Sequence, residues 1–431
     1  MKKSLFALAA TTAIAGAAQA QSSVTVYGIL DMGYIGSNAR EVSAAGAVNK
    51  IQKSAFGASA EQTSRLGFKG TEDLGGGTSA FFTVELGLQP QNGNLSGSQD
   101  KDAIQGTTNG GGSAIDNRQS FLGLKKNGIG QAAFGRQYTP VFNAGAATDP
   151  GQYNNVAGNV IYNSGSVYTA DALGSGTNNN IGFTNRASNS LTFKTDSLAG
   201  FTVSGQYALA NQNATVGGGV ASIGSTGGSS NWNGWGLGAD FTWQKLYVTA
   251  AYQSFKTQYT NNVIATSNAI LNTNGSAATT GNLTATGTVF TASNLSDKQT
   301  YAGATYDFGI LKAYAQWVGR KVQQDTGAAS VVGEQLNRTA QQIGVRSYIT
   351  PTIESWASIG SGKYKGAPLS AVASSPYVNF VGWQLGSNYY LSKRTNLYAI
   401  YGQQQSSSST GGTVGSGNSA NQYALGLRHT F

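Results

Sequence analysis

The chain has 431 residues, with 27 Lys and Arg against 18 Asp and Glu, one His and no Cys, so its formal net charge is +9. A single histidine and no cysteine exclude disulfides, a multi-His or Cys zinc site and a conventional His-based catalytic triad. The mean hydropathy of −0.22 argues against a helical membrane protein.

The first twenty residues, Met1 to Ala20, are predicted to be a cleaved secretory signal peptide. Lys2 and Lys3 precede a short apolar run, which ends in the small-x-small pattern Ala18-Gln19-Ala20. Without Lys2 and Lys3 the mature chain, 21–431, carries 25 basic and 18 acidic residues, a formal charge of +7. Beyond this segment no uninterrupted apolar stretch reaches about 18 residues, so no transmembrane helix is expected.

The remainder of the chain alternates apolar and polar residues with a period of two, which is typical of β-strands. In Phe201–Leu209 the odd positions are mostly apolar, whereas Thr202, Ser204 and Gln206 fall on the other face. Leu311–Trp317 repeats the pattern with Lys312 and Gln316. The 60 Gly are spread through such segments and do not collect in a linker.

Short and long connections alternate between these segments. The long polar connections are expected near Ser37–Gly57, Pro90–Ala114, Pro140–Asn180, Asn211–Asn231, Gln258–Asp297, Gln324–Glu334, Gly366–Ser375 and Gln405–Asn418. The count is about 16 strands with seven short turns and eight long loops, as in an outer-membrane antiparallel meander.

The C-terminal strand supports a membrane location. Tyr423, Leu425, Leu427, His429 and the terminal Phe431 fall on one face, which is suited to lipid with the aromatic ring at the interface. Trp317, Trp383, Tyr389 and Tyr390 are expected to be interface aromatics on other strands.

The fold class predicted from these patterns is all-β, a transmembrane antiparallel β-barrel of 16 strands in a single domain. Closure removes open edges and satisfies the backbone in hydrocarbon. A barrel of this size is too wide for side chains to fill, so its interior should hold water and pass small hydrophilic solutes and ions.

Six segments also carry a family resemblance: Ser23–Asp31, Ser64–Gly75, Asn117–Leu124, Phe134–Pro140, Asn185–Leu191 and Gly426–Phe431. They are similar to the general porins of Gram-negative bacteria, specifically the trimeric betaproteobacterial type. The resemblance implies three barrels per assembly in the outer membrane. It also implies a third outer loop, here about 141–180, that folds inward as a pore constriction.

The resemblance assigns Arg65, Arg118 and Arg186 to the wall of that constriction. Alternation agrees for two of them, because Leu66 and Phe68, and Leu191 and Phe193, read as lipid-facing. The parity of Arg118 is ambiguous, since Phe121 and Leu122 compete for the outer face. Additional lumen charges are expected at Lys69, Lys194 and, near the end of its strand, Arg136.

The predicted constriction loop has only two carboxylates between Val141 and Asn180, Asp149 and Asp171, which are expected to face the arginines. Three arginines against two acids leave a net positive constriction, so the sequence predicts a preference for anions. One unit charge at about 4 Å contributes roughly 1 kcal/mol in water and about 4 kcal/mol at an effective dielectric near 20, enough to bias passage without trapping an ion.

The resemblance also implies partners: a homotrimer, outer-membrane lipid and lipopolysaccharide, and the barrel-assembly machinery, with Phe431 as the assembly signal of the C-terminal strand. No cofactor, metal or nucleic acid is expected.

An enzyme is not expected. The chain lacks a strict G-x-S-x-G elbow and a P-loop, and its Gly234-x-Gly236-x-x-Ala239 match to a dinucleotide fingerprint has no βαβ context. Two alternatives to a general diffusion porin remain open: a substrate-specific outer-membrane channel, and a surface adhesin or receptor that acts through its long loops.

Overall fold

A computed structural model of the chain describes residues 23–91, 116–162, 186–214, 228–260, 292–325, 334–366, 377–409 and 415–431. The predicted signal peptide and Asp171 lie outside these ranges. The strands are β1 (Ser23–Val42), β2 (Val48–Ala58), β3 (Arg65–Gly75), β4 (Thr78–Gly87), β5 (Asn117–Lys126), β6 (Gly130–Tyr138), β7 (Arg186–Thr195), β8 (Phe201–Ala214), β9 (Gly228–Trp243), β10 (Leu246–Thr260), β11 (Ala292–Asp307), β12 (Lys312–Asp325), β13 (Glu334–Thr350), β14 (Ile353–Gly366), β15 (Tyr377–Tyr390), β16 (Thr395–Ser409) and β17 (Gly417–Thr430).

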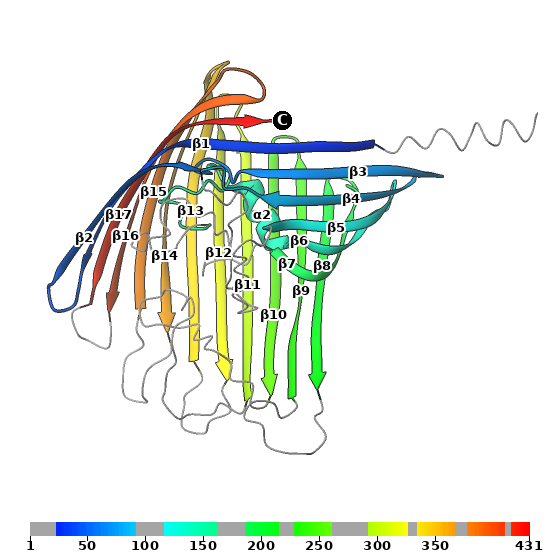
Figure 1. Cartoon of the computed structure of the whole chain (residues 1–431), viewed down its shortest axis with the longest axis horizontal. Coiled ribbons are helices and arrows are strands. Elements are labelled where there is room, and N and C mark those ends of the chain that lie inside the picture. The colour runs from blue at the N-terminus through cyan, green and yellow to red at the C-terminus, as the bar shows by residue number, and fades with distance from the viewer. Residues whose placement is uncertain are drawn as a thin grey trace, which may run out of the picture.

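The strands form one closed antiparallel barrel (Figure 1). From β3 to β17 each strand pairs with the next along the chain, and β1 pairs with β17 on one side and with β2 and β3 on the other. Seventeen strands occupy sixteen positions, because β2 and β3 share one: β2 lies beside Met32–Val42 and β3 beside Ser23–Ile29 of the same strand. The predicted fold class is therefore confirmed.

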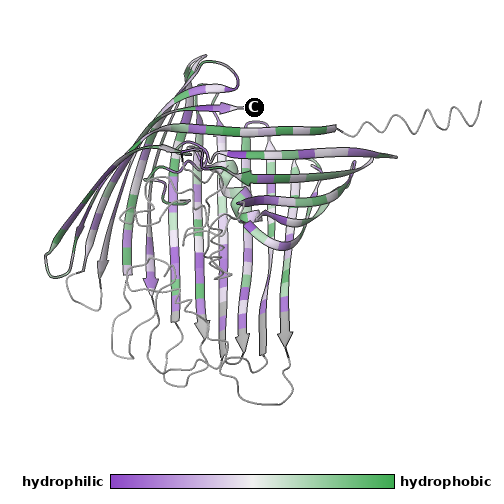
Figure 2. Cartoon of the chain, viewed as in Figure 1, coloured by the Kyte–Doolittle hydropathy of each residue, from purple (hydrophilic) through white to green (hydrophobic). Residues whose placement is uncertain are grey.

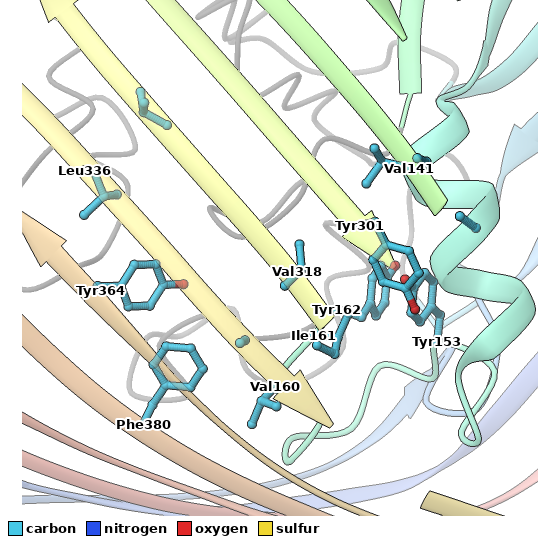
Figure 3. Close-up of a cluster of buried hydrophobic side chains, with 14 residues drawn as sticks. Val141, Tyr153, Val160, Ile161, Tyr162, Tyr301, Val318, Leu336, Tyr364 and Phe380 are labelled. Carbon is cyan, nitrogen blue, oxygen red and sulfur yellow. The ribbon is translucent and has the colours of Figure 1, made fainter. Parts of the chain in front are cut away.

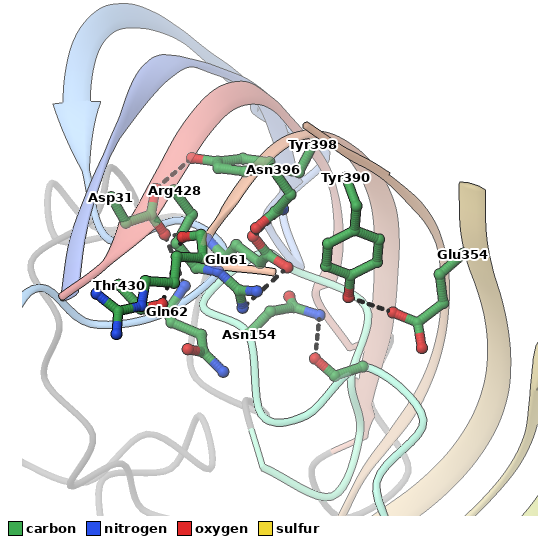
Figure 4. Close-up of polar contacts among 12 residues, drawn as sticks. Asp31, Glu61, Gln62, Asn154, Glu354, Tyr390, Asn396, Tyr398, Arg428 and Thr430 are labelled. Carbon is green, nitrogen blue, oxygen red and sulfur yellow. Dashed lines mark hydrogen bonds and ion pairs between the residues drawn. The ribbon is translucent and has the colours of Figure 1, made fainter. Parts of the chain in front are cut away.

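A cluster of hydrogen bonds holds the break between β2 and β3, at residues 59–64 (Figure 4). The carboxylate of Asp31 accepts hydrogen bonds from the backbone N–H of Glu61 at 2.8 Å and of Gln62 at 2.6 Å. The Tyr398 hydroxyl donates to the other carboxylate oxygen at 2.6 Å. The buried turn is thus satisfied from the barrel wall, as buried backbone groups require.

The outer face of the barrel is apolar. Exposed large apolar side chains recur at every second position, for example Leu122 and Leu124 on β5, and Leu425 and Leu427 on β17. Figure 2 shows the corresponding alternation of hydrophobic and hydrophilic residues along the strands. This surface forms a continuous apolar belt. Such a belt is favourable in contact with lipid hydrocarbon and unfavourable in contact with water.

Two details of the outer face bear on the sequence-based expectations. Trp317 and Tyr389 are exposed as expected for interface aromatics, but Tyr390 turns inward and donates to Glu354 at 2.8 Å. The terminal Phe431 is exposed, and its backbone exchanges two hydrogen bonds of 3.1 Å with Gly28, which joins the end of the chain to β1.

Several predicted long loops are in fact strand. The expected loop Ser37–Gly57 is almost entirely the β1–β2 hairpin, and only residues 43–47 connect the two strands. Strands β8 and β10 similarly continue to Ala214 and Thr260. These extensions are rich in Ser, Asn, Ala and Lys, so they lack the apolar alternation that marks the membrane-facing parts of the strands.

The only helix in the described part of the chain, α2 (Pro140–Thr148), packs inside the barrel against β9, β10 and β11. No helix among the described residues is long and apolar enough to cross a membrane. The largest buried apolar cluster joins α2 and the residues after it to the wall, and includes Val141, Val160, Ile161, Tyr301 and Val318 (Figure 3). The apolar core that positions the site therefore lies between this inner segment and the barrel.

Candidate functional site

The described part of the predicted constriction loop, residues 140–162, lies against the inner wall. Thr139 caps α2, because its hydroxyl oxygen accepts the Phe142 N–H at 3.2 Å, and Pro140 fits the first helical position. After the helix, Tyr153, Val156, Val160 and Ile161 are all buried. We refer to residues 140–162 as the inner segment.

Three inward glutamines of the wall hold the inner segment. Gln384 of β15 exchanges hydrogen bonds with the Asn154 side chain at 2.6 and 2.8 Å. Gln422 of β17 accepts the Ala157 N–H at 2.8 Å, and Gln342 of β13 accepts the Val160 N–H at 3.1 Å. Because the segment has no sheet partner at these points, the glutamine amides replace the missing backbone partners.

A glycine allows the inner segment to approach the wall closely. Gly158 has a φ of +106°, and a Cβ at this position would lie 2.1 Å from the carbonyl oxygen of Trp383. Only glycine is compatible with both this backbone conformation and this contact.

Asp149 anchors the inner segment. Its carboxylate accepts the Tyr153 N–H at 2.8 Å, Asn159 Nδ2 at 2.7 Å and Gln342 Nε2 at 3.0 Å, and the residue is 2% exposed. Burial raises the pKa of Asp149 to about 6. The sequence predicted that this carboxylate faces the wall arginines. In the structure its hydrogen bonds direct it toward Gln342 of β13 instead.

The structure brings Arg65, Arg118 and Arg186 together on the inner wall. Arg118 Nε lies 2.8 Å from Glu85 Oε1, and Arg65 Nη1 lies 3.9 Å from the same oxygen. Arg118 Nη2 also donates to the Tyr138 hydroxyl at 2.8 Å, and the Arg186 guanidinium lies 5.3 Å from the centre of the Tyr138 ring. We call Arg65, Arg118 and Arg186 the arginine trio.

A bulge places Arg118 on the inner side. Between β4 and β5 the register moves from Glu85 opposite Gln119 to Leu86 opposite Asn117, so Arg118 is the extra residue. Leu122, exposed to 63%, sets the outer face of β5, and simple alternation from Leu122 would point Arg118 outward as well. The extra residue reverses that parity, since a bulge re-aims the side chains beyond it.

Charge balance distinguishes the arginine trio from three other arginines of the wall. Arg320 pairs with Asp297, Arg346 with Glu354 at 2.6 Å, and Arg428 with Glu61 at 3.3 Å. Within the arginine trio, Arg65 and Arg118 share Glu85, the one carboxylate within ion-pair distance among the described residues, and Arg186 has no such partner there. Among the described residues, the three guanidinium groups therefore outnumber the carboxylates that act on them, so the local charge is positive.

Arg186 has hydrogen-bond donors that no described residue accepts. The residue is 5% exposed, and its Nε and Nη2 atoms have no hydrogen-bond acceptor among the described residues. A buried guanidinium with unpaired N–H donors is costly unless an acceptor approaches it.

An aromatic stack connects the arginine trio to the inner segment. The ring of Tyr138, beneath Arg186, stacks on Phe142 with centroids 4.3 Å apart. Phe142 contacts Tyr153 at 5.3 Å, and Tyr153 stacks on Tyr162 at 4.2 Å. The wall charges and α2 are therefore held in one packed unit.

Of the three additional charges predicted for the lumen, two are exposed and one is buried. Lys69 and Lys194 are exposed on the inner side of their strands, and Lys69 Nζ lies 5.4 Å from the ring of Tyr27. Arg136 is buried near the end of β6, where it donates to the Asn117 carbonyl at 2.9 Å and to Ser188 Oγ at 2.7 Å. Arg136 therefore links neighbouring strand ends.

Glu85 and Tyr138 are site residues that the sequence interpretation missed. Glu85 is the only charged residue of β4 and lies between Val84 and Leu86. An isolated carboxylate in a membrane-spanning strand indicates a functional residue, and this was the sequence feature that could have identified Glu85. Tyr138 precedes Thr139 and Pro140, where a strand end gives no indication of side-chain direction.

Nothing in the described residues suggests a metal centre, since no group of three or more His, Asp or Glu side chains lies together there. The chemistry that the arrangement offers is electrostatic: fixed guanidinium donors on a wall that faces the packed inner segment.

The sequence model described as "Gram-negative porin" matches residues 7–431, nearly the whole chain. The chain belongs to the Gram-negative porin family. This membership agrees with the closed barrel, its apolar outer face and an outer-membrane location.

Individual relatives match shorter segments. An outer membrane porin protein of Bordetella pertussis is 40% identical over 144 residues, which is 32% of this chain and 34% of the relative. Outer membrane porin protein 32 of Delftia acidovorans is 39% identical over 142 residues, 32% of this chain and 33% of that protein. The major outer membrane protein P.IB of Neisseria gonorrhoeae is 34% identical over 165 residues, 38% of this chain and 40% of the relative. The matches thus span about a third to two-fifths of these relatives.

Solved structures share the fold. The anion-selective porin from Comamonas acidovorans superposes with a TM-score of 0.60 at 21% identity, covering 95% of this chain and 100% of the other. OmpT of Vibrio cholerae, in its trimer form, gives a TM-score of 0.55 at 13% identity and covers 95% of this chain and 99% of the other. At these identities the similarity concerns the barrel architecture alone.

Proposed function

We propose that this protein is a general diffusion porin, a water-filled channel through which ions and small hydrophilic solutes cross the outer membrane passively. Family membership and the closed barrel of sixteen positions support the proposal. A barrel of this size leaves an aqueous lumen, which the inner segment partly occupies. A channel of this kind needs no catalytic group.

We further propose that the channel prefers anions and that the arginine trio lines its constriction. The observation that carries this proposal is the local excess of positive charge: among the described residues, Glu85 is the one carboxylate that pairs with the arginine trio, and it pairs with Arg65 and Arg118 but not with Arg186. Each unpaired charge at about 4 Å from a passing ion contributes roughly 1 kcal/mol in water and about 4 kcal/mol at an effective dielectric near 20. Such energies favour anions in the constriction but still allow their release.

The partners proposed for the channel are two further copies of this chain, outer-membrane lipid including lipopolysaccharide, and the barrel-assembly machinery. A trimer agrees with the trimer form of the structurally similar OmpT. The exposed terminal Phe431 is proposed as the assembly signal, because it ends the strand that closes the barrel against β1.

The alternative as an adhesin depends on loops that lie largely outside the described residues, so no structural observation favours it. A substrate-specific channel would be recognised by a saturable block of the current by one solute at sub-millimolar concentration.

Single-channel recording in a planar bilayer tests the proposed function. Refolded protein in detergent should insert and produce stepwise currents that rise linearly with KCl concentration, and a trimer should produce steps in groups of three. Heat-unfolded protein at the same concentration is the control. A folded preparation that leaves the bilayer impermeable would refute the channel.

A further inference from the structure

Five lysines stand on the outer face of the sheet between β10 and β14, on four of these five adjacent strands and near the ends that lead into the long connections. Lys256 belongs to β10, Lys298 to β11, Lys321 to β12, and both Lys363 and Lys365 to β14. All five are exposed, and each neighbours a buried, inward-facing residue, such as Phe255 beside Lys256 and Val322 beside Lys321. We call these five residues the lysine band.

The sheet register brings the lysine band into one row. Lys298 lies directly opposite Lys321, which lies opposite Asn337, which in turn lies opposite Lys365. Side chains that are directly opposite have Cβ atoms about 5 Å apart, and like charges in this arrangement destabilise a sheet. Lys256 lies opposite Ser296, one diagonal step from Lys298, and Lys363 is two residues from Lys365 on the same face.

Three carboxylates of these strands have side chains that the structure describes, and none of them pairs with the lysine band. Asp297 pairs with Arg320 and Glu354 with Arg346, all four on the inner side, and Asp307 lies at the opposite, short-turn end of β11. Within the described residues no acid forms an ion pair with the lysine band. Lys363 Nζ lies 4.3 Å from the centre of the Tyr377 ring.

The same strands present apolar side chains directly below the lysine band. Trp317 on β12, Ile343 on β13 and Ile359 on β14 are exposed on the outer face, toward the short-turn end. Lys321 is four residues from Trp317, and Lys363 is four residues from Ile359, so about 13 Å of strand separates charge from apolar surface. An amphiphile fits this arrangement, because its anionic head can contact the lysines while its acyl chains contact the apolar side chains.

We propose that the lysine band binds the phosphate groups of a phosphorylated glycolipid of the outer leaflet, whose acyl chains lie along the apolar belt below. The proposal rests on the proposed function, since it requires the barrel to stand in the outer membrane with its long connections outward. Phosphate oxygens bound between Lys298 and Lys321 relieve the repulsion between these opposed ammonium groups.

Thermal unfolding of the folded protein in detergent tests the proposal, with diphosphorylated lipid A titrated against its dephosphorylated form. Lipid A should raise the Tm of the wild-type protein, and the dephosphorylated form should raise it much less. The triple variant Lys298→Gln, Lys321→Gln, Lys365→Gln should bind lipid A about a hundredfold more weakly, because each lysine near an anionic lipid surface contributes about fivefold.

A matched variant removes three lysines at the short-turn end, Lys125→Gln, Lys245→Gln and Lys393→Gln, and should keep the wild-type affinity. Equal binding by wild type and the triple lysine-band variant would overturn the proposal. An equal Tm shift with inorganic phosphate alone would also overturn it, because the site would then take free anions. Single-channel conductance of the same preparations reports the channel separately, and it should be equal in all variants.

Discussion

Arg118 and Arg186 occupy neighbouring places on the wall but differ in how their donors are satisfied. Arg118 uses Nε for Glu85 and Nη2 for Tyr138, so part of its charge is neutralised within the protein. Arg186 lies over the face of Tyr138, and two of its N–H-bearing nitrogens are unpaired among the described residues. Of the two, Arg186 should therefore contribute more to anion preference.

Replacing Arg186 by Gln removes one positive charge from the constriction and keeps a polar side chain. The permeability ratio of chloride to potassium should fall about fivefold, which corresponds to about 1 kcal/mol for one charge near a passing ion. Arg186→Lys keeps the charge and should retain most of the preference. Bi-ionic or gradient potentials measure the ratio, and an unchanged ratio in Arg186→Gln would remove this residue from the proposed constriction.

The raised pKa of Asp149 predicts a pH effect on stability. Burial raises this pKa from 3.8 to about 6, so the folded protein holds the proton more tightly than the unfolded chain does in that window. Stability contributed by this group is therefore highest at low pH and falls as the pH rises through about 4 to 6. The Asp149→Asn side chain does not titrate. The Tm of this variant should therefore fall less than the Tm of the wild type between about pH 4 and about pH 7. Equal pH dependence in both proteins would contradict the assignment.

At the scale of the element, the inner segment is a loop fixed by side chains of the barrel. Gln342, Gln384 and Gln422 supply its hydrogen bonds, and Arg338 donates to the carbonyl oxygens of Val160 and Ile161. Such a segment can be loosened without opening the sheet, because its contacts are separate from the strand ladders.

Gln384→Ala tests this separation. The substitution leaves the Asn154 amide and the carbonyl oxygens of Val156 and Ala157 without their partner, at a cost of about 1–3 kcal/mol for the unsatisfied groups. Amide hydrogen exchange in residues 149–162 should become faster, while exchange in the strands changes little. Gln341→Ala, on the outer side of β13, is the matched control and should leave both unchanged. Faster exchange throughout the barrel would argue against a separately anchored segment.

How far the sequence predicts these elements depends on what each residue faces. Alternation identifies strands where one face meets lipid, as at Leu191 and Phe193 of β7, which are exposed on the outer face. It fails beyond the apolar belt, where both faces are polar, and so the β1–β2 hairpin was interpreted as a loop. It also fails at the Arg118 bulge, because one inserted residue reverses parity without any mark in the composition.

Long-range contacts account for the remaining differences. Asp149 is 193 residues from Gln342, and no local pattern indicates that this carboxylate meets a wall amide instead of the arginine trio. Glu85 and Tyr138 belong to the site only because the register of β3 to β7 brings them beside Arg65, Arg118 and Arg186.

At the scale of the whole molecule, two charge distributions are separated by the barrel wall. The arginine trio lies on the inner side beside the packed inner segment, and the lysine band lies on the outer side of β10 to β14. Because the two groups lie on opposite faces of the wall, substitutions in the lysine band should leave the ion preference of the channel unchanged. Substitutions in the arginine trio should likewise leave lipid binding unchanged.

The central claim is that the barrel encloses a water-filled passage whose fixed charge is positive. The most direct measurement is the zero-current potential of the wild-type channel in a planar bilayer under an approximately tenfold KCl gradient. Chloride crossing faster than potassium should make the dilute side negative. A positive dilute side would show cation preference and contradict the assignment of the arginine trio to the constriction.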